Sequence, residues 1–206
     1  MTTLNRLDIR HLQRPGLGPI DLSVPGGSCI CLSGPSGAGK TLLLRTIADL
    51  DCHSGHLSLD GIACQSMTPV QWRSQVGLLT AESYWWGLKV GDHFSCDSQS
   101  FIKQLGFAPT VMDWSVDRLS SGERQRLALL RLLQNQPKVL LLDEPTANLD
   151  PANVQRMEAL LQDFRINNNT ALLWVSHDQR QTQRVSQVHY RMESGRLEPA
   201  PIGPHT

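Results

Sequence analysis

The sequence lacks a long apolar run. No stretch of its 206 residues approaches the roughly 18 consecutive apolar residues that a helix needs to cross a bilayer. The first residues interrupt their apolar side chains with charges, and the hydrophobic segment of a secretory signal peptide is missing. We therefore expect a cytoplasmic protein. If it works at the inner face of a membrane, another chain must attach it there.

An excess of charge of one sign is also absent. The chain has 19 Lys and Arg residues and 19 Asp and Glu residues, so its formal net charge is zero. Nucleic-acid binding generally needs a strong positive field, which this composition does not predict. We expect no nucleic-acid partner.

The cysteines do not form a recognisable framework. There are five, an odd number, and no C-x-x-C pair occurs. They are Cys29, Cys31, Cys52, Cys64 and Cys96. This pattern argues against disulfides and a zinc site, and it is typical of a reducing compartment.

Apolar runs that alternate with helical patterns indicate an α/β fold. Ser28–Gly34, Lys138–Glu144 and Ala171–Asp178 have the continuous apolar character of buried parallel strands. After the second run, Asp150 is placed to cap a helix whose first residue is Pro151. We predict a mainly parallel sheet flanked by helices.

The rest of the chain divides into smaller parts of one domain over residues 1–206. The Asp60-Gly61 pair in "HLSLDGIAC" predicts a hairpin, and with it a small N-terminal antiparallel β subdomain. Residues 83–136 predict a short α-helical subdomain, so the core comprises residues 1–82 and 137–197. The tail, residues 198–206, is rich in proline and is expected to be loose.

The stretch "GPSGAGKT" has the spacing of a phosphate-binding loop between a strand and a helix. Its glycines allow several backbone N–H groups to point at phosphates, and the helix N-terminus adds positive potential. Lys40 would reach the β- and γ-phosphates, and the Thr41 hydroxyl would bind Mg²⁺. The predicted nucleotide-binding residues here are Gly34, Pro35, Ser36, Gly37, Ala38, Gly39, Lys40 and Thr41. The core is thus predicted to be that of a P-loop NTPase.

Two carboxylates end the apolar run "VLLLDEP". Neighbouring side chains on an extended chain point in opposite directions, so Asp143 and Glu144 are expected to have different roles. Asp143 is placed to hold Mg²⁺, and Glu144 to polarise a water for attack on the γ-phosphate.

Four motifs in one order resemble those of ATP-binding cassette (ABC) ATPases. They are Gly34–Thr41, "LSSGE" at Leu119–Glu123, "VLLLDEPTANLD" at Val139–Asp150 and "WVSHD" at Trp174–Asp178. The resemblance covers about residues 4–197, and the motif sequences are similar to those of small bacterial members, including ones paired with metal exporters. It implies a transporter's ATP-binding and ATP-hydrolysing subunit, with ATP and Mg²⁺ as cofactors.

The resemblance also implies partners and further site residues. Two copies would pair head to tail, so that Ser120, Ser121, Gly122 and Glu123 of one copy bind the γ-phosphate held by the other. His177 matches the switch histidine that contacts the γ-phosphate, and Asp150 ends the D-loop that crosses the dimer interface. An integral membrane transporter subunit would be driven by closure of this dimer on ATP.

Two features depart from the family pattern. Ala81 stands where a Mg²⁺-binding glutamine is usual, and the neighbouring Glu82 is either its replacement or a solvated surface residue. No aromatic residue precedes Trp72, so His11 is either the ring that stacks on adenine or an exposed histidine without a role. The aromatic group Tyr84–Trp86 either docks the membrane subunit or packs the helical subdomain.

These departures keep two other functions open. One is an ATP-dependent switch or scaffold of ABC type with weak or no hydrolysis. The other is a soluble ABC ATPase outside transport, although such proteins usually carry a coiled-coil insertion or a second cassette, for which 206 residues leave no room.

Overall fold

The N-terminal part of the chain forms an antiparallel sheet. The computed structural model describes residues 5–95 and 99–202, so Cys96 and the end of the predicted loose tail lie outside the described residues. In spatial order the strands of this sheet are β2 (Leu17–Pro25), β1 (Asn5–Arg14), β4 (Ser54–Leu59) and β5 (Ile62–Ala63). Asp60 and Gly61 both have positive φ, 52° and 80°, as a tight hairpin between β4 and β5 requires. The predicted hairpin and antiparallel subdomain are confirmed.

The second sheet is mainly parallel. Its order is β10 (Arg196–Ala200), β9 (Val188–Glu193), β3 (Cys29–Ser33), β8 (Ala171–Val175), β7 (Val139–Asp143) and β6 (Val76–Leu79). Only β10 runs antiparallel to its neighbour. All five side chains of β7 and of β8 are buried, because helices cover one face and α1 with the first sheet covers the other. This arrangement confirms the predicted α/β fold class.

Six α-helices and four short 3₁₀ helices complete the described residues. The α-helices are α1 (Lys40–Ile47), α2 (Pro69–Gln75), α3 (Gln99–Gln104), α4 (Ser121–Leu133), α5 (Pro151–Asn168) and α6 (Gln179–Val185). The 3₁₀ helices are η1 (Cys64–Ser66), η2 (Val90–His93), η3 (Pro109–Asp113) and η4 (Val116–Arg118). As predicted, the Asp150 side chain caps α5, accepting from the Asn153 N–H, and Pro151 is its first residue.

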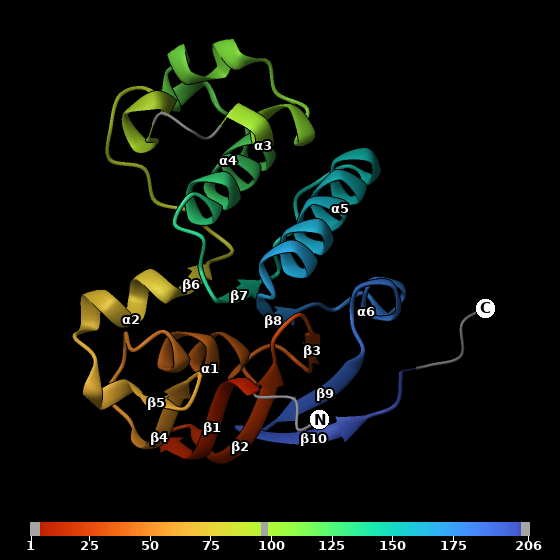
Figure 1. Cartoon of the computed structure of the whole chain (residues 1–206). Helices are drawn as coiled ribbons and strands as arrows, with labels where there is room; N and C mark the ends of the chain where they lie inside the picture. Colours follow the sequence, from red (N-terminus) through yellow and green to blue (C-terminus); the bar gives the residue numbers. More distant parts are fainter. Residues whose placement is uncertain (1–4, 96–98, 203–206) are drawn as a thin grey trace.

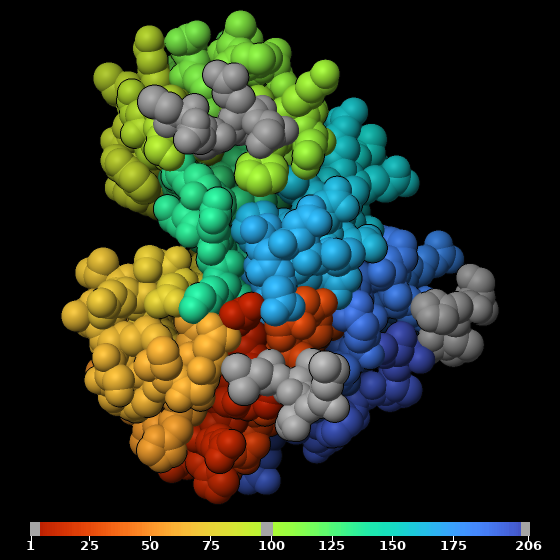
Figure 2. All heavy atoms as spheres, in the orientation of Figure 1, coloured from red at the N-terminus to blue at the C-terminus, as the bar shows by residue number. Residues whose placement is uncertain are grey.

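Two cores lie on opposite faces of the parallel sheet. Leu141 and Leu173 belong to the first core, with α1 and the antiparallel sheet, while Leu140 and Leu172 belong to the second, with α4 and α5. The alternation follows the two-residue period of a strand. Figure 1 shows the two sheets, α1 and α2 in one lobe and the green helical part in another, and Figure 2 shows the same two lobes with all atoms drawn.

The end of the chain differs from the expectation. Residues 198–200 belong to β10, where Pro199 pairs with Tyr190 of β9, so the prediction of a loose tail from residue 198 was wrong. An edge strand tolerates proline because one side of it needs no backbone donor. The proline content of the tail therefore did not prevent pairing.

Candidate active site

The phosphate loop connects β3 to α1. Gly34, Gly37 and Gly39 have φ angles of 143°, 78° and 106°, which residues other than glycine rarely adopt. A Cβ atom at Gly34 would collide with the carbonyl oxygen of Met192 on β9. The sequence needs glycine here for both reasons, and the resulting turn leads directly into the N-terminus of α1.

The Lys40 ammonium closes the loop from inside. The residue is 7% exposed, and its Nζ donates to the carbonyl oxygens of Gly34 at 2.8 Å and Pro35 at 3.0 Å. Both partners are neutral, so the positive charge is not cancelled by them. A cation held beside backbone N–H groups at a helix N-terminus is an anion-binding arrangement.

Thr41 and Asp143 meet at the carboxyl edge of the parallel sheet. The Thr41 hydroxyl donates to Asp143 Oδ2 over 2.7 Å. Burial raises the pKa of Asp143 and nearby Glu144 adds to the rise, whereas the hydrogen bond from Thr41 and the charges of Lys40 and His177 lower it. A nearby cation would stabilise the ionised form of a carboxylate buried in this way.

The chemistry of these donors fits Mg²⁺. A hydroxyl and a carboxylate are the oxygen ligands that this cation prefers, and Mg²⁺ usually takes its remaining ligands from water and phosphate. Among residues 5–95 and 99–202, no group of three or more His, Cys, Asp or Glu side chains is placed to hold a metal by itself. The pair is therefore suited to a metal that arrives with a phosphate ligand.

Glu144 and His177 form the neighbouring pair. Glu144 Oε1 lies 3.0 Å from His177 Nε2, and the two side chains are 37% and 46% exposed. Glu144 has a φ of 48°, which turns the chain immediately after β7. The two acids thus have different partners, Thr41 for Asp143 and His177 for Glu144, although Glu144 lacks the extended backbone from which the difference was expected.

The Ser120–Glu123 turn caps α4. Ser120 Oγ accepts from the Glu123 N–H, and Glu123 Oε2 accepts from the N–H and hydroxyl of Ser120. Gly122 lies against Asn148 and Leu149, each within 3.1 Å of where a Cβ would stand. No hydrogen bond or ion pair of the described residues joins this turn to Gly34–Thr41. Within one copy, the two predicted phosphate-binding segments are not brought together.

Comparison with known proteins assigns this arrangement to a family. A family model described as "ABC transporter" matches residues 17–147 of the chain. The chain belongs to the ABC transporter ATPase family. The ATP-binding proteins of this family are ATPases, and the fold and the order of the motifs agree with that activity.

Individual relatives of this ABC protein include components of exporters and importers. It is 31% identical over 185 residues to the "Probable iron export ATP-binding protein FetA" of Escherichia coli (strain K12), covering 84% of this chain and 82% of that protein. It is 33% identical to the "Aliphatic sulfonates import ATP-binding protein SsuB" of Burkholderia pseudomallei (strain K96243) over 205 residues. That alignment covers 94% of this chain and 60% of the longer relative.

Solved structures support the fold. The cbiO1 protein of Clostridium perfringens, described as part of the ABC transporter complex cbiONQ, superposes with a TM-score of 0.80 at 21% identity. The match covers 94% of this chain and 87% of that one. At this identity the likeness concerns the ABC fold alone.

Glu82 is not brought to the Thr41–Asp143 pair of this ABC ATPase. The described residues show no hydrogen bond or ion pair from Glu82 to either side chain, and Glu82 is exposed. The Thr80 hydroxyl donates to the Glu82 carbonyl and folds the segment into a turn after β6. The two alternatives for Glu82, a replacement metal ligand or a solvated surface residue, therefore stay predictions.

His11 is likewise held elsewhere. Its Nδ1 and its backbone N both lie 2.9 Å from Asp21 Oδ1, at an irregularity in β1 where His11 has a φ of 50°. The bond engages only Nδ1, and the His11 side chain is 81% exposed, so its two alternatives, a ring that stacks on adenine or an exposed histidine without a role, stay predictions.

Gln181 was missed by sequence reasoning and connects the two segments that carry Glu144 and His177. It is 5% exposed on α6, its Oε1 accepts from Ser176, and its Nε2 donates to Thr146 and Glu158, each over 2.8 Å. Ser176 precedes His177, and Thr146 follows Glu144 by two residues. Gln181 therefore holds both halves of the Glu144–His177 pair. A glutamine in the first turn of a short helix gave no signal of this burial.

Gln125 is a second buried glutamine that links separate segments, here in the helical part. It is buried on α4, donates to the Thr80 carbonyl at 3.1 Å and accepts from the Ser83 hydroxyl at 3.2 Å. Thr80 and Ser83 flank the position of the missing family glutamine at Ala81. Gln125 thus ties the segment after β6 to the helix that the signature turn caps.

Proposed function

We propose that this ABC ATPase hydrolyses ATP with Mg²⁺ at a site completed by a second copy, and so drives an integral membrane transporter subunit. The observation that carries the proposal is the pair of contacts at one sheet edge, Thr41 with Asp143 and Glu144 with His177. The first pair has the ligands for the metal, and the second has a base and its positioning partner. Both adjoin the loop that carries Lys40.

The proposed mechanism assigns one task to each group. Lys40 and the loop N–H groups bind and orient the β- and γ-phosphates. Thr41 and Asp143 would hold Mg²⁺, which would neutralise charge on those phosphates. Glu144 accepts a hydrogen bond, and then the proton, from the attacking water. His177 keeps the Glu144 carboxylate aligned through its Nε2, and on ATP binding it would turn to donate to the γ-phosphate.

A second copy would supply the remaining phosphate donors. Ser120 and Ser121 are exposed at the N-terminus of α4, and in their own chain they are not bonded to the phosphate loop. Neutral donors at a helix N-terminus suit a phosphate. Leu149 of the D-loop, which ends at Asp150, contacts Gly122, so the signature turn and the D-loop would enter a dimer interface together.

An apolar loop supports the proposed membrane partner. Tyr84, Trp86 and Leu88 are 79%, 68% and 84% exposed, beside a cavity of about 410 Å³ that Tyr84 and Trp86 line with Arg131. Such a patch is typical of a protein contact. Buried His93 fixes the loop, because its Nε2 accepts from the N–H groups of Trp86 and Gly87. We propose that a segment of the membrane subunit docks here, on the cytoplasmic side.

The test is the variant Glu144→Gln. Because an amide cannot take the proton of the attacking water, we expect steady-state ATP hydrolysis to fall by about 10²–10⁴-fold while ATP binding is retained. The matched control is Glu198→Gln, since Glu198 is exposed on β10. Unchanged turnover in Glu144→Gln would remove Glu144 from its role. Undetectable turnover in the unsubstituted protein, with and without a membrane partner, would favour the switch or scaffold function.

A further inference from the structure

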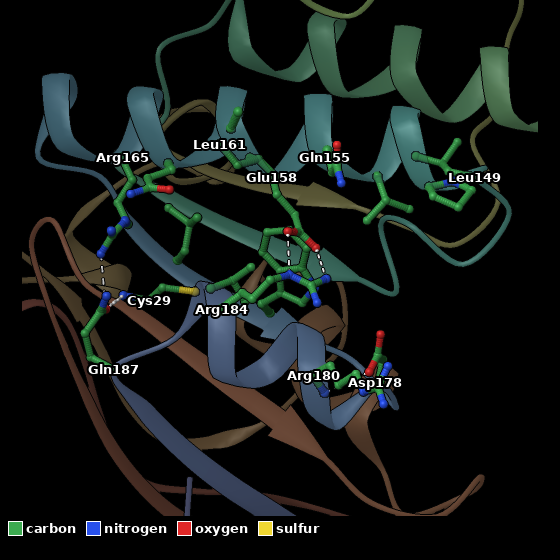
Figure 3. Close-up of a pocket in the computed structure, with 17 residues that line it drawn as sticks. Cys29, Leu149, Gln155, Glu158, Leu161, Arg165, Asp178, Arg180, Arg184 and Gln187 are labelled. Atoms are coloured by element: carbon green, nitrogen blue, oxygen red, sulfur yellow. Dashed lines mark hydrogen bonds and ion pairs between the residues drawn. The ribbon is translucent and has the colours of Figure 1, made fainter. Parts of the chain in front are cut away.

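A large cavity lies outside the proposed active site, between α5 and α6. Its volume is about 790 Å³, within the range of small-molecule sites. Figure 3 shows its shape: Arg165, Cys29 and Gln187 lie at one end, Leu149, Arg180 and Asp178 at the other, and Glu158 meets Arg184 between them. The apolar lining includes Leu149, Val154, Leu161, Leu172 and Val185. The cavity can therefore enclose an apolar body between polar ends.

Arg165 brings an uncompensated charge to this cavity. The residue is 9% exposed, and its Nη1 donates to the carbonyl oxygen of Gly27 at 2.8 Å and to Gln187 Oε1 at 3.1 Å. Both acceptors are neutral, and no carboxylate of the described residues forms an ion pair with it. A buried guanidinium without a counter-charge is unfavourable, and an anion in the cavity would relieve this.

The other polar groups of the lining also favour an acceptor of hydrogen bonds. Trp174 is 1% exposed, and its indole N–H has no hydrogen-bond partner among the described residues. A hydrogen bond with Cys31 and burial raise the pKa of the Cys29 thiol, so Cys29 adds no negative charge. Donors are thus left over in the lining.

The two acids that line the cavity are already engaged. Glu158 accepts from Arg184 Nη2 at 2.8 Å and Nε at 3.1 Å, while Asp178 caps α6 by accepting from the Arg180 N–H at 2.8 Å. The guanidinium groups of Arg165 and Arg180 remain without an ion pair in the part of the chain described. The balance of charge in the cavity favours an anion.

The cavity is connected to the catalytic pair. Glu158 Oε1, which binds Arg184, also accepts from Gln181 Nε2, and Gln181 holds Thr146 and Ser176 beside Glu144 and His177. A ligand that competes for Arg184 or shifts α6 would therefore move the support of that pair. We propose that the α5–α6 cavity is a regulatory site for a small amphipathic organic anion, with Arg165 as its charged anchor. The regulatory effect rests on the proposed ATPase mechanism, whereas binding does not.

Octanoate and octyl phosphate are suitable probes. The controls are octanol, which lacks the negative charge, and inorganic phosphate, which lacks the apolar chain. Binding is followed by the ¹H–¹⁵N resonance of the Trp174 indole in the full chain, assigned with Trp174→Phe. We expect saturable shifts with an anionic probe, and an affinity at least about tenfold lower in Arg165→Gln. Arg165→Lys should restore part of the affinity. Arg156→Gln, a change of the same kind elsewhere on α5, should bind normally.

The outcomes separate the alternatives. No saturable shift, equal shifts with octanol, equal shifts with inorganic phosphate, or full binding by an Arg165→Gln variant that still binds ATP would each overturn the site. In the ATPase assay, we expect a saturating probe to change kcat by roughly fivefold or more in either direction without competing with ATP. Arg165-dependent binding with unchanged kcat would overturn the regulatory role. Because binding is measured without hydrolysis, its failure is distinguishable from failure of the proposed function.

Discussion

The edge of the parallel sheet and the helical part hold their functional residues in different ways. At the sheet edge, Asp143 ends β7 and His177 follows β8, two strands with a continuous ladder, while Thr41 lies in the first turn of α1. In the helical part, side-chain bonds join the segments: Gln125 joins α4 to the loop after β6, and His93 of η2 joins the loop at Trp86. The first region is held mainly by backbone, to which Gln181 adds its side-chain bonds, and the second depends more on individual polar side chains.

This difference indicates where each region is sensitive. A substitution at the sheet edge removes a chemical group but leaves the ladder, so chemistry should fall more than stability. A substitution among the linking side chains leaves the chemistry in place but frees a buried polar partner. The predictions below are ordered by the size of the expected effect.

Thr41→Val should give the largest of the three effects, a loss of Mg²⁺ affinity. It removes the hydroxyl that lies 2.7 Å from Asp143, and we expect about a 10- to 100-fold loss of apparent Mg²⁺ affinity in the ATPase assay. The matched control is Thr46→Val on the same helix, where the hydroxyl only donates to the Leu42 carbonyl. An equal loss in both variants would mean that α1 is damaged, and would contradict a specific role for Thr41.

Gln125→Leu should weaken the helical part. It leaves the Thr80 carbonyl without its side-chain donor, so we expect the free energy of unfolding to fall by about 1–3 kcal/mol, as measured by urea denaturation. Stimulation of the ATPase by a membrane partner should fall further than basal turnover, because Gln125 joins the loop after β6 to α4. Wild-type stability and stimulation together would show that this link is not used.

Asp143→Asn should have the smallest effect. It should slightly raise the free energy of unfolding, whereas Gln125→Leu lowers it. Burial raises the pKa of Asp143, so the folded protein holds its proton to higher pH than the unfolded chain. Stability is then lost as pH rises from the unfolded pKa through the folded one, and the penalty is complete above the folded pKa. Without nucleotide, the variant should be slightly more stable than the wild type at neutral pH, and this advantage should vanish in acid. Thermal denaturation across pH tests this, and an advantage that grows toward acid would contradict it.

The sequence predicted the sheet edge well because its motifs are local. Asp150 and Pro151 specify the start of α5 within a few residues, and the phosphate loop is specified by glycines whose backbone angles no other residue adopts easily. The fold class followed from short continuous apolar runs, which are typical of strands in a sheet covered on both faces. These features depend little on distant parts of the chain.

The omissions concern side-chain contacts that no short motif specifies. His11 is bonded to Asp21 because an irregularity in β1 turns it toward β2, and spacing from the phosphate loop could not show this. Gln181 is buried only because Thr146, Glu158 and Ser176 converge on it from three other segments. The lining of the α5–α6 cavity likewise comes from β3, β8 and two helices. Such convergence is a property of tertiary packing and leaves no short motif.

The central claim is that two copies enclose ATP, with the loop of one and the signature turn of the other on the same γ-phosphate. Its most direct test is a structure of Glu144→Gln with bound ATP and Mg²⁺. We expect the amide nitrogen of Gly122 to lie about 3 Å from a γ-phosphate oxygen held by the Gly34–Thr41 loop of the other copy. A structure with ATP fully bound in one copy and Gly122 facing solvent would contradict the claim.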